Sequence, residues 1–121
     1  MPHLHMEYTA NLPQLDVDQA LLRFNQALAA SGQFSDEFDI KSRAIKLDHF
    51  RVGTNPGERA FIHLKLALLS GRSAEIKQQL SERLLAQLQE LGPWPADLSV
   101  QLCVEIIDID SASYSKAALG L

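Results

Sequence analysis

Pro2 is the first residue whose chemistry stands out, because it follows the initiator Met in MPHLHMEY. Removal of Met1, which is normal before a small residue, would make Pro2 an N-terminal secondary amine. An α-amino group has a pKa near about 8, and apolar burial beside guanidinium groups would lower the pKa of a prolyl amine towards neutrality. Such a group suits general base catalysis. Proline is also tolerated at the start of a strand, so a purely structural role stays open.

Three cations are candidates to bind an anion. Arg72 lies in S-G-R-S, where a glycine turn leads into a predicted helix whose first N–H groups favour an anion, and its planar fork matches a carboxylate. Lys41 and Arg43 are separated by one residue in K-S-R and therefore lie on the same side of a strand. The alternative is that Arg72 is a solvated loop residue and that K-S-R is a polar edge.

Histidine and cysteine give weaker indications. His3 and His5 share a strand face and His63 could lie nearby, but no cysteine or carboxylate stands at ligand spacing and no HExxH motif is present. We therefore expect no metal site. Cys103 is the single cysteine, so it cannot form an intrachain disulfide, and its alternating strand predicts a packed residue rather than a reactive one.

Composition excludes several classes of partner. The 121 residues carry a net charge of −4, which argues against nucleic acid or an anionic membrane as the main partner. No apolar run approaches the roughly 20 residues that span a bilayer, and no secretory signal is evident, so we expect a cytoplasmic protein. A small anionic ligand is compatible with this charge if a few local cations hold it.

The spacing of apolar residues predicts the elements that position these candidates. Alternation with a period of two predicts strands over residues 2–9, 43–52, 58–69 and 98–109. Helical spacing predicts one helix from Asp16 to near Gly32 and another from Ser73 to Leu91, with Asp16 and Ser73 as N-caps. The turn-rich T-N-P-G after the second strand predicts that this strand and the next one pair.

The order strand, helix, strand occurs twice and predicts an α+β fold. We expect a single domain over 1–121, in which two βαβ halves, about 2–53 and 58–108, form a four-stranded mixed sheet with two helices on one face, followed by a tail over 109–121. Right-handed crossovers make the strands of each half parallel, and the short link makes the middle strands antiparallel. Phe61, Leu69 and Ile107 would point to the uncovered face, and an exposed apolar face predicts oligomerisation.

Taken in order, several stretches resemble the 5-carboxymethyl-2-hydroxymuconate delta-isomerase family of the tautomerase superfamily. The resemblance covers nearly the whole chain, and it depends on the order and spacing of short motifs rather than on one of them. These motifs are MPH at the start, S-G-x-F at 31–34, I-x-S-R at 40–43, F-x-H-x-x-L-x-x-x-x-G-R-S at 61–73, the K-Q-Q helix that follows and V-E-I at 104–106.

The resemblance implies a tautomerase-like homotrimer with inward-packed sheets, sites near subunit interfaces and no cofactor. It implies a small anionic dienol as substrate, in the breakdown of homoprotocatechuate: neutral Pro2 takes the proton of the 2-hydroxyl and returns it at carbon 5, giving the conjugated ketone. Arg72 would bind a substrate carboxylate or polarise the oxyanion, and Arg43 also matches. Lys41 stands where the family has arginine and lacks the planar fork, so a related dicarboxylate could be the substrate.

Two alternatives to the isomerase stay open. While Met1 is attached, the nitrogen of Pro2 is a tertiary amide and cannot act as a base. This amide and the presence of Lys41 support the first alternative, a non-catalytic trimeric relative that binds a small carboxylate or a protein partner. A structural α+β oligomer without a ligand requires Pro2 and Arg72 to lie far apart in the assembly. The tail D-S-A-S-Y-S-K-A-A-L-G-L is a candidate to dock on a neighbouring subunit.

Overall fold

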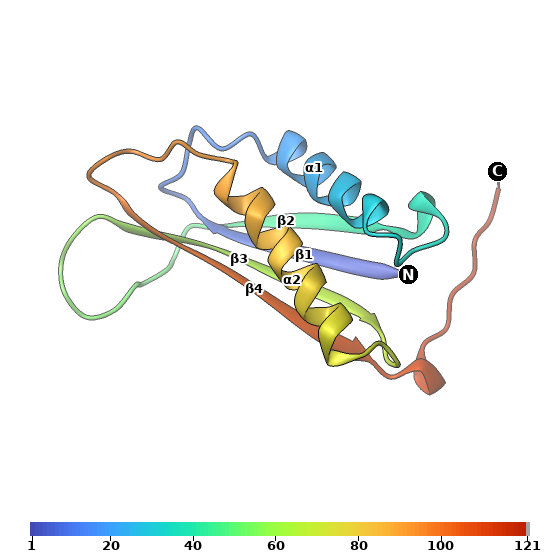
Figure 1. Cartoon of the computed structure of the whole chain (residues 1–121). Coiled ribbons are helices and arrows are strands. Elements are labelled where there is room, and N and C mark those ends of the chain that lie inside the picture. Colours follow the sequence, from blue (N-terminus) through green and yellow to red (C-terminus); the bar gives the residue numbers. More distant parts are fainter. Residues whose placement is uncertain (121) are drawn as a thin grey trace.

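The chain folds into a four-stranded sheet with two helices on one face (Figure 1). A computed structural model describes residues 1–120. The last residue of the tail, Leu121, lies outside the described residues. Two short 3-10 turns, η1 (Glu37–Asp39) and η2 (Ser111–Ser113), precede β2 and follow β4. The main elements are β1 (Pro2–Thr9), α1 (Val17–Ala30), β2 (Lys41–Leu47), β3 (Arg59–Leu69), α2 (Ala74–Gln89) and β4 (Ser99–Ile109). The predicted α+β class is confirmed.

The sheet has the strand order β2-β1-β3-β4. β1 is parallel to β2 and β3 is parallel to β4, whereas the central pair, β1 and β3, is antiparallel. The predicted pairing across T-N-P-G is wrong, because β2 ends at Leu47 and does not neighbour β3. The crossover through α1 places β2 on the outer side of β1, so the connection over 48–58 must carry the chain past β1 before β3 begins.

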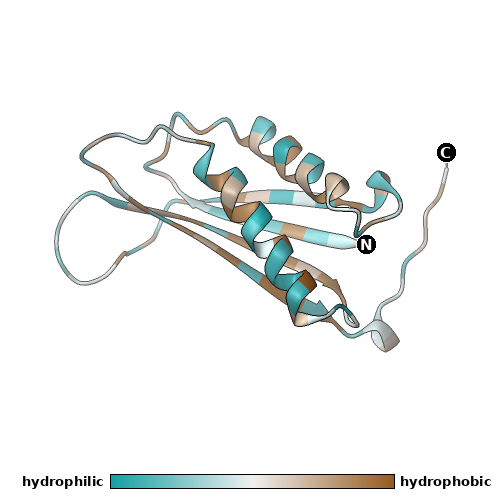
Figure 2. Cartoon of the chain, viewed as in Figure 1, coloured by the Kyte–Doolittle hydropathy of each residue, from teal (hydrophilic) through white to brown (hydrophobic). Residues whose placement is uncertain are grey.

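The core lies between the sheet and the helices. The predicted alternation is confirmed in β3, where every second residue is buried, and in β1 up to Met6, whereas Tyr8 is half-buried. The alternation of hydropathy is visible along the strands in Figure 2. Both predicted N-caps are confirmed: the Asp16 carboxylate accepts a hydrogen bond from the Gln19 N–H at 3.1 Å, and the Ser73 hydroxyl accepts one from the Ile76 N–H at 3.2 Å. The fully buried side chains include Leu4, Met6, Phe24, Leu28, Ile62, Leu64, Leu66, Leu68, Leu84 and Leu88.

The face of the sheet without helices is more polar than the sequence predicted. Phe61, Leu69 and Ile107 lie there half-buried, but the centre of the face carries charge. His5 is paired in register with both Arg43 and Lys65 on the neighbouring strands. The expectation of an apolar face is therefore wrong for its centre, because β1 and β2 place charged residues at its outward positions.

Cys103 also lies on this face, in β4, and it is exposed. The expectation that it is packed is wrong, because alternation places a residue on one of two faces but does not say which face the helices cover. Its register partner is His63, whose imidazole Nε2 lies 2.9 Å from a carboxylate oxygen of Glu105. Within the described part of the chain, neither helix is long and apolar enough to cross a membrane.

Candidate functional site

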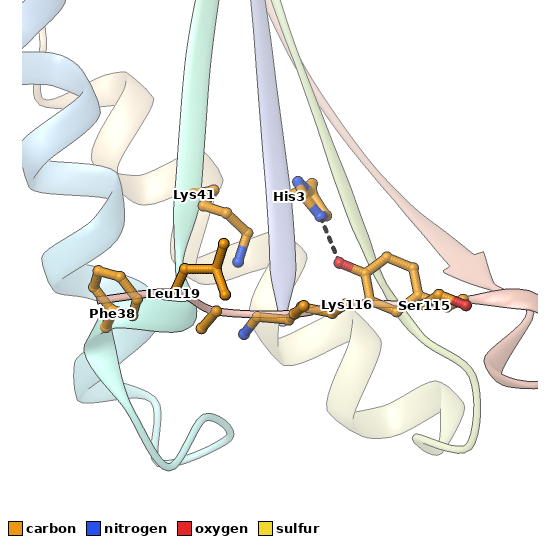
Figure 3. Close-up of a pocket in the computed structure, with 9 residues that line it drawn as sticks. His3, Phe38, Lys41, Ser115, Lys116 and Leu119 are labelled. Atoms are coloured by element: carbon orange, nitrogen blue, oxygen red, sulfur yellow. Dashed lines mark hydrogen bonds between the residues drawn. The ribbon is translucent and has the colours of Figure 1, made fainter. Parts of the chain in front are cut away.

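A cavity of about 550 Å³ opens at the end of the sheet where β1 and β2 begin (Figure 3). His3 of β1, Phe38 of η1 and Lys41 of β2 form one side of it, and the tail over 114–119 forms the other. β4 ends at this same end of the sheet, and η2 directs the chain from there back towards β1 (Figure 1). The cavity therefore joins residues from the two ends of the sequence.

His3 connects the tail to β2. Its Nδ1 lies 2.7 Å from Nη2 of Arg43, and its Nε2 lies 3.1 Å from the hydroxyl of Tyr114. Because a guanidinium has only donors, Nδ1 must accept, and in the neutral ring the proton is then on Nε2, which donates to the Tyr114 oxygen. Burial, followed by the charges of Arg43 and Lys41, lowers the pKa of His3, which favours this neutral form.

Two lysines share one aspartate beside the cavity. The Lys41 ammonium donates to the backbone carbonyl of Asp39, and the Lys116 ammonium pairs with the Asp39 carboxylate. That hydrogen bond lowers the pKa of Asp39 and raises the pKa of Lys116. Burial, and then the charge of Lys116, lowers the pKa of Lys41. Among the described residues, the side chains that line the cavity thus include two ammonium groups and no carboxylate, and this excess of positive charge suits an anionic ligand.

The N-terminus lies in the same field of charge. Burial lowers the pKa of the Met1 amino group, and the charges of Lys41, Lys116 and Arg72 lower it further, whereas Asp39 acts in the opposite direction. Pro2 begins β1 opposite Leu68 of β3 and is itself buried. In the chain that still carries Met1, Pro2 is not among the described residues that line the cavity.

Arg72 is held firmly in the turn between β3 and α2. Gly71 has a φ of 121°, a conformation that favours glycine, and this turn directs Arg72 towards the loop that follows α1. Its Nη2 donates to the carbonyl of Gln33 at 2.8 Å, and the guanidinium carbon lies 4.9 Å from the centre of the Phe34 ring. The guanidinium is thus fixed in place, near enough for its charge to act on the N-terminus.

The predicted site residues are therefore arranged in three different ways. Lys41 lines the cavity, Arg43 reaches it through His3, and Arg72 stands beside the N-terminus without lining the cavity. Participation of Pro2, Arg72, Lys41 and Arg43 in catalysis or substrate binding stays a prediction. Across residues 1–120, no three His, Cys, Asp or Glu side chains gather in a way that could hold a metal ion.

Sequence reasoning missed Asp39, Tyr114 and Lys116. Tyr114 and Lys116 are separated by one residue, the same spacing that drew attention to Lys41 and Arg43, so a weak signal was present. Tyr114 and Lys116 contact His3 and Asp39 of their own chain. Docking of the tail on a neighbouring subunit stays a prediction, but part of the tail already has a place on its own chain.

Comparison with known proteins gives a consistent result. The family model for 5-carboxymethyl-2-hydroxymuconate isomerase matches residues 2–119. The 5-carboxymethyl-2-hydroxymuconate Delta-isomerase of Escherichia coli is 32% identical over 85 residues, which are 69% of this chain and 67% of that protein.

Solved structures agree with the sequence comparison. A 5-carboxymethyl-2-hydroxymuconate isomerase from Deinococcus radiodurans R1 has a TM-score of 0.84 and 30% identity, covering 96% of this chain and 88% of that one. The fused 4-OT wild-type symmetric trimer has a TM-score of 0.68 and 18% identity, covering 95% of this chain and 91% of that one. The second likeness concerns the fold alone.

Proposed function

The chain belongs to the 5-carboxymethyl-2-hydroxymuconate isomerase family of the tautomerase superfamily, and we propose that it isomerises 5-carboxymethyl-2-hydroxymuconate or a closely related carboxylated dienol through Pro2. One observation carries this proposal. The start of β1 lies beside a cavity whose wall has excess positive charge, and the burial and cations found there lower the pKa of the terminal amine.

Removal of Met1 would convert the Pro2 nitrogen from an amide into a secondary amine. The new terminus would stand one residue further along β1, in the surroundings that already lower the pKa of the Met1 amine. Burial and nearby cations disfavour a protonated amine, so the pKa of the Pro2 amine should lie below that of a free prolyl amine and its neutral fraction should be larger. A neutral amine at a fixed position has a lone pair available as a base.

The proposed reaction is a proton transfer with no net redox change. The Pro2 nitrogen takes the proton of the 2-hydroxyl of the dienol, leaving a dienolate and a protonated amine. The same proton is then delivered to carbon 5 as the 2-oxygen becomes a ketone. Nearby cations stabilise the negative charge that develops on the 2-oxygen, and the planar, fixed fork of Arg72 is suited to that role or to a carboxylate.

Lys41 is the proposed carboxylate ligand inside the cavity. Its ammonium is a compact charge that can follow a carboxylate of varied orientation, whereas an arginine would impose a planar, two-pronged geometry. Arg43 contributes indirectly, since it holds His3 against the cavity. A cavity of about 550 Å³ is in the range that accommodates a small organic ligand.

The proposed pathway and assembly follow from the family. A dienol with these carboxylates is an intermediate of homoprotocatechuate breakdown, and we place the chain in that pathway. We also propose a homotrimer whose uncovered sheet faces pack together, because the two helices leave that face free. Its central charges would then be matched by polar groups of the neighbouring subunits, as Glu105 is matched within this chain by the His63 imidazole at 2.9 Å.

The experiment compares two forms of one protein on the same dienol. One form is shown by intact mass to lack Met1, and the other carries a two-residue extension ahead of Met1 that keeps Pro2 as an amide. Loss of the ultraviolet absorbance of 5-carboxymethyl-2-hydroxymuconate is followed for both, with circular dichroism to confirm equal folding. We expect kcat of the extended form to be lower by at least about 10²-fold, the usual contribution of a general base.

Two outcomes would count against the proposal. Equal kcat in both forms would exclude Pro2 as the base, and retained activity in Pro2→Ala would point the same way. Failure of the form without Met1 to turn over the dienol would favour a protein that binds a small carboxylate without catalysis.

A further inference from the structure

Building on the proposed function, we propose that Lys116 binds a third carboxylate of the substrate and that the tail over 114–119 is a wall of the substrate site. The tail supplies six of the nine residues that line the cavity. Lys116 is the one tail residue among these six whose side chain carries a charge. The chemistry of the tail side of the cavity therefore depends on this ammonium group.

Lys116 and Lys41 face the same space from opposite sides. Figure 3 shows both side chains reaching the cavity below the start of β1, one from β2 and the other from the tail. The charge of Lys116 lowers the pKa of Lys41, which means that the two ammonium groups are close enough to repel each other. A carboxylate placed between them would remove this repulsion, and Asp39 alone cannot neutralise both.

Asp39 holds the position that a substrate carboxylate would take. The side chains of Lys116 and Asp39 are 36% and 27% exposed, so water can reach their ion pair. An ion pair that water can reach contributes little to stability, and exchanging Asp39 for a ligand carboxylate therefore costs little. The ion pair keeps the Lys116 ammonium at the cavity until an anion arrives.

The tail is held in place by polar contacts rather than by burial. The Tyr114 hydroxyl meets Nε2 of His3 at 3.1 Å, and the hydroxyls of Ser70 and Ser111 lie 3.0 Å apart. Leu119 is 97% exposed, so the tail beyond Lys116 is not fixed by packing. Tyr114 lies two residues before Lys116, and its contact with His3 therefore positions the lysine.

This arrangement selects a dienol with three carboxylates over one with two. Lys41 and Arg72 are already assigned to carboxylate or oxyanion binding, and Lys116 adds a third separate cation on the other wall. The preference for three carboxylates would follow from the number of cations at the site, even though Lys41 lacks the planar guanidinium of an arginine. A substrate without the carboxymethyl group would leave Lys116 paired with Asp39.

The test compares Lys116→Gln with Lys46→Gln, a matched loss of charge in β2 away from the cavity, where Lys46 pairs with Asp48 at 3.9 Å. Steady-state kinetics are measured on 5-carboxymethyl-2-hydroxymuconate and on 2-hydroxymuconate, which lacks the third carboxylate. We expect Lys116→Gln to raise KM for the first dienol about tenfold, as for loss of a charged hydrogen bond, with kcat within about twofold. The KM of Lys116→Gln for 2-hydroxymuconate, and the KM of Lys46→Gln for both dienols, should equal the wild-type values. Tyr114→Phe should raise KM for the first dienol by less than Lys116→Gln does.

The outcomes separate this inference from the proposed function. If the wild type is active and Lys116→Gln has the same KM values as Lys46→Gln, the inference is overturned and the proposed isomerase activity stands. The same conclusion follows if Lys116→Gln raises KM equally for both dienols. If the wild type turns over neither dienol, the proposed function fails, and calorimetric titration with tricarballylate decides about Lys116. Binding that is lost in Lys116→Gln alone supports the inference, and equal or absent binding in wild type and variant overturns it.

Discussion

The two ends of the sheet are built on the same plan but carry different chemistry. At one end β1 and β2 begin while β3 and β4 finish, and at the other end the roles are exchanged (Figure 1). Each end also receives the N-terminus of one helix, capped by Ser73 at the cavity end and by Asp16 at the opposite end. The backbone alone therefore offers two comparable positions for a site.

The side chains distinguish the two ends. At the opposite end, Nη1 of Arg59 donates to the carbonyl of Val52 at 3.0 Å, and the Asn11 amide donates to the carbonyl of Arg59 at 2.9 Å. The arginine there ties a loop to the start of a strand. At the cavity end, Lys41 and Lys116 line the cavity, and their charges act together with that of Arg72 on the amine that precedes β1. Cationic side chains around a cavity therefore distinguish one end, whereas the polar contacts at the other end hold a loop in place.

The largest expected effect comes from the core that both ends share. Phe24 of α1 is fully buried against the sheet, so Phe24→Ala should lower the free energy of unfolding by about 3–5 kcal/mol. Urea denaturation measures this loss, and Leu22→Ala, at a side chain that is 50% exposed, should stay within about 0.5 kcal/mol. The folded fraction of Phe24→Ala should keep the wild-type kcat. A large loss of kcat in fully folded Phe24→Ala would mean that this side chain supports the site at the cavity end rather than a core that both ends share.

The second prediction compares one arginine from each end. Arg72→Ala should lower kcat/KM by about 10²-fold, because the charge stabilisation that we propose for its fixed guanidinium is lost. Arg59→Ala should leave kcat/KM within about twofold but lower the free energy of unfolding by about 1 kcal/mol, through the lost bond to Val52. Steady-state kinetics and urea denaturation of both variants check this. The comparison fails if both arginines affect kcat/KM equally.

The sequence predicted what depends on local spacing. The helices, their caps and the alternation of β1 and β3 are encoded within a few residues of each position, and the structure agrees with them. The pairing of β2 with β3 was wrong, since strand order depends on which side of β1 the crossover through α1 places β2. The exposure of Cys103 was missed for a related reason, because the covered face is decided by both helices together.

The site was predictable only in part, for a physical reason. Pro2, Arg72 and Lys41 were predicted from residue chemistry and from the order of motifs along the whole chain, and of these three Lys41 lines the cavity. The contacts that close the cavity join residues far apart in sequence, such as His3 with Tyr114 and Asp39 with Lys116. No periodicity relates such positions, because their approach depends on where β4 ends and in which direction η2 turns the chain.

The third prediction compares the two helix caps. Ser73→Ala and Asp16→Ala should each lower the free energy of unfolding by about 1 kcal/mol, because each leaves an N–H of the first helical turn without its acceptor. Only Ser73→Ala should also lower kcat/KM, by a few fold, since it loosens the turn that holds Arg72. Urea denaturation and kinetics on the same two proteins measure both effects. Equal kinetic losses would mean that the cap at the opposite end also supports the site.

The smallest expected effect is a dependence of stability on pH that comes from β1, in which His3 lies at the cavity end and His5 lies one step further along the uncovered face. Burial and the charge of Arg43 lower the pKa of both His3 and His5 from the ordinary value of 6.5. At a pH between 6.5 and the lower pKa of the folded state, the unfolded chain therefore binds more protons than the folded chain. The free energy of unfolding should therefore fall as pH drops below about 6.5, and this contribution should level off once the pH passes the native pKa values. His3→Gln should flatten the dependence in urea midpoints measured from pH 7.5 to 5, whereas His49→Gln, at an exposed residue beyond β2, is the control. A wild-type slope that persists in His3→Gln and His5→Gln would mean that the charge at this end does not disfavour protonation of the imidazoles, and the electrostatic distinction between the two ends would then be lost.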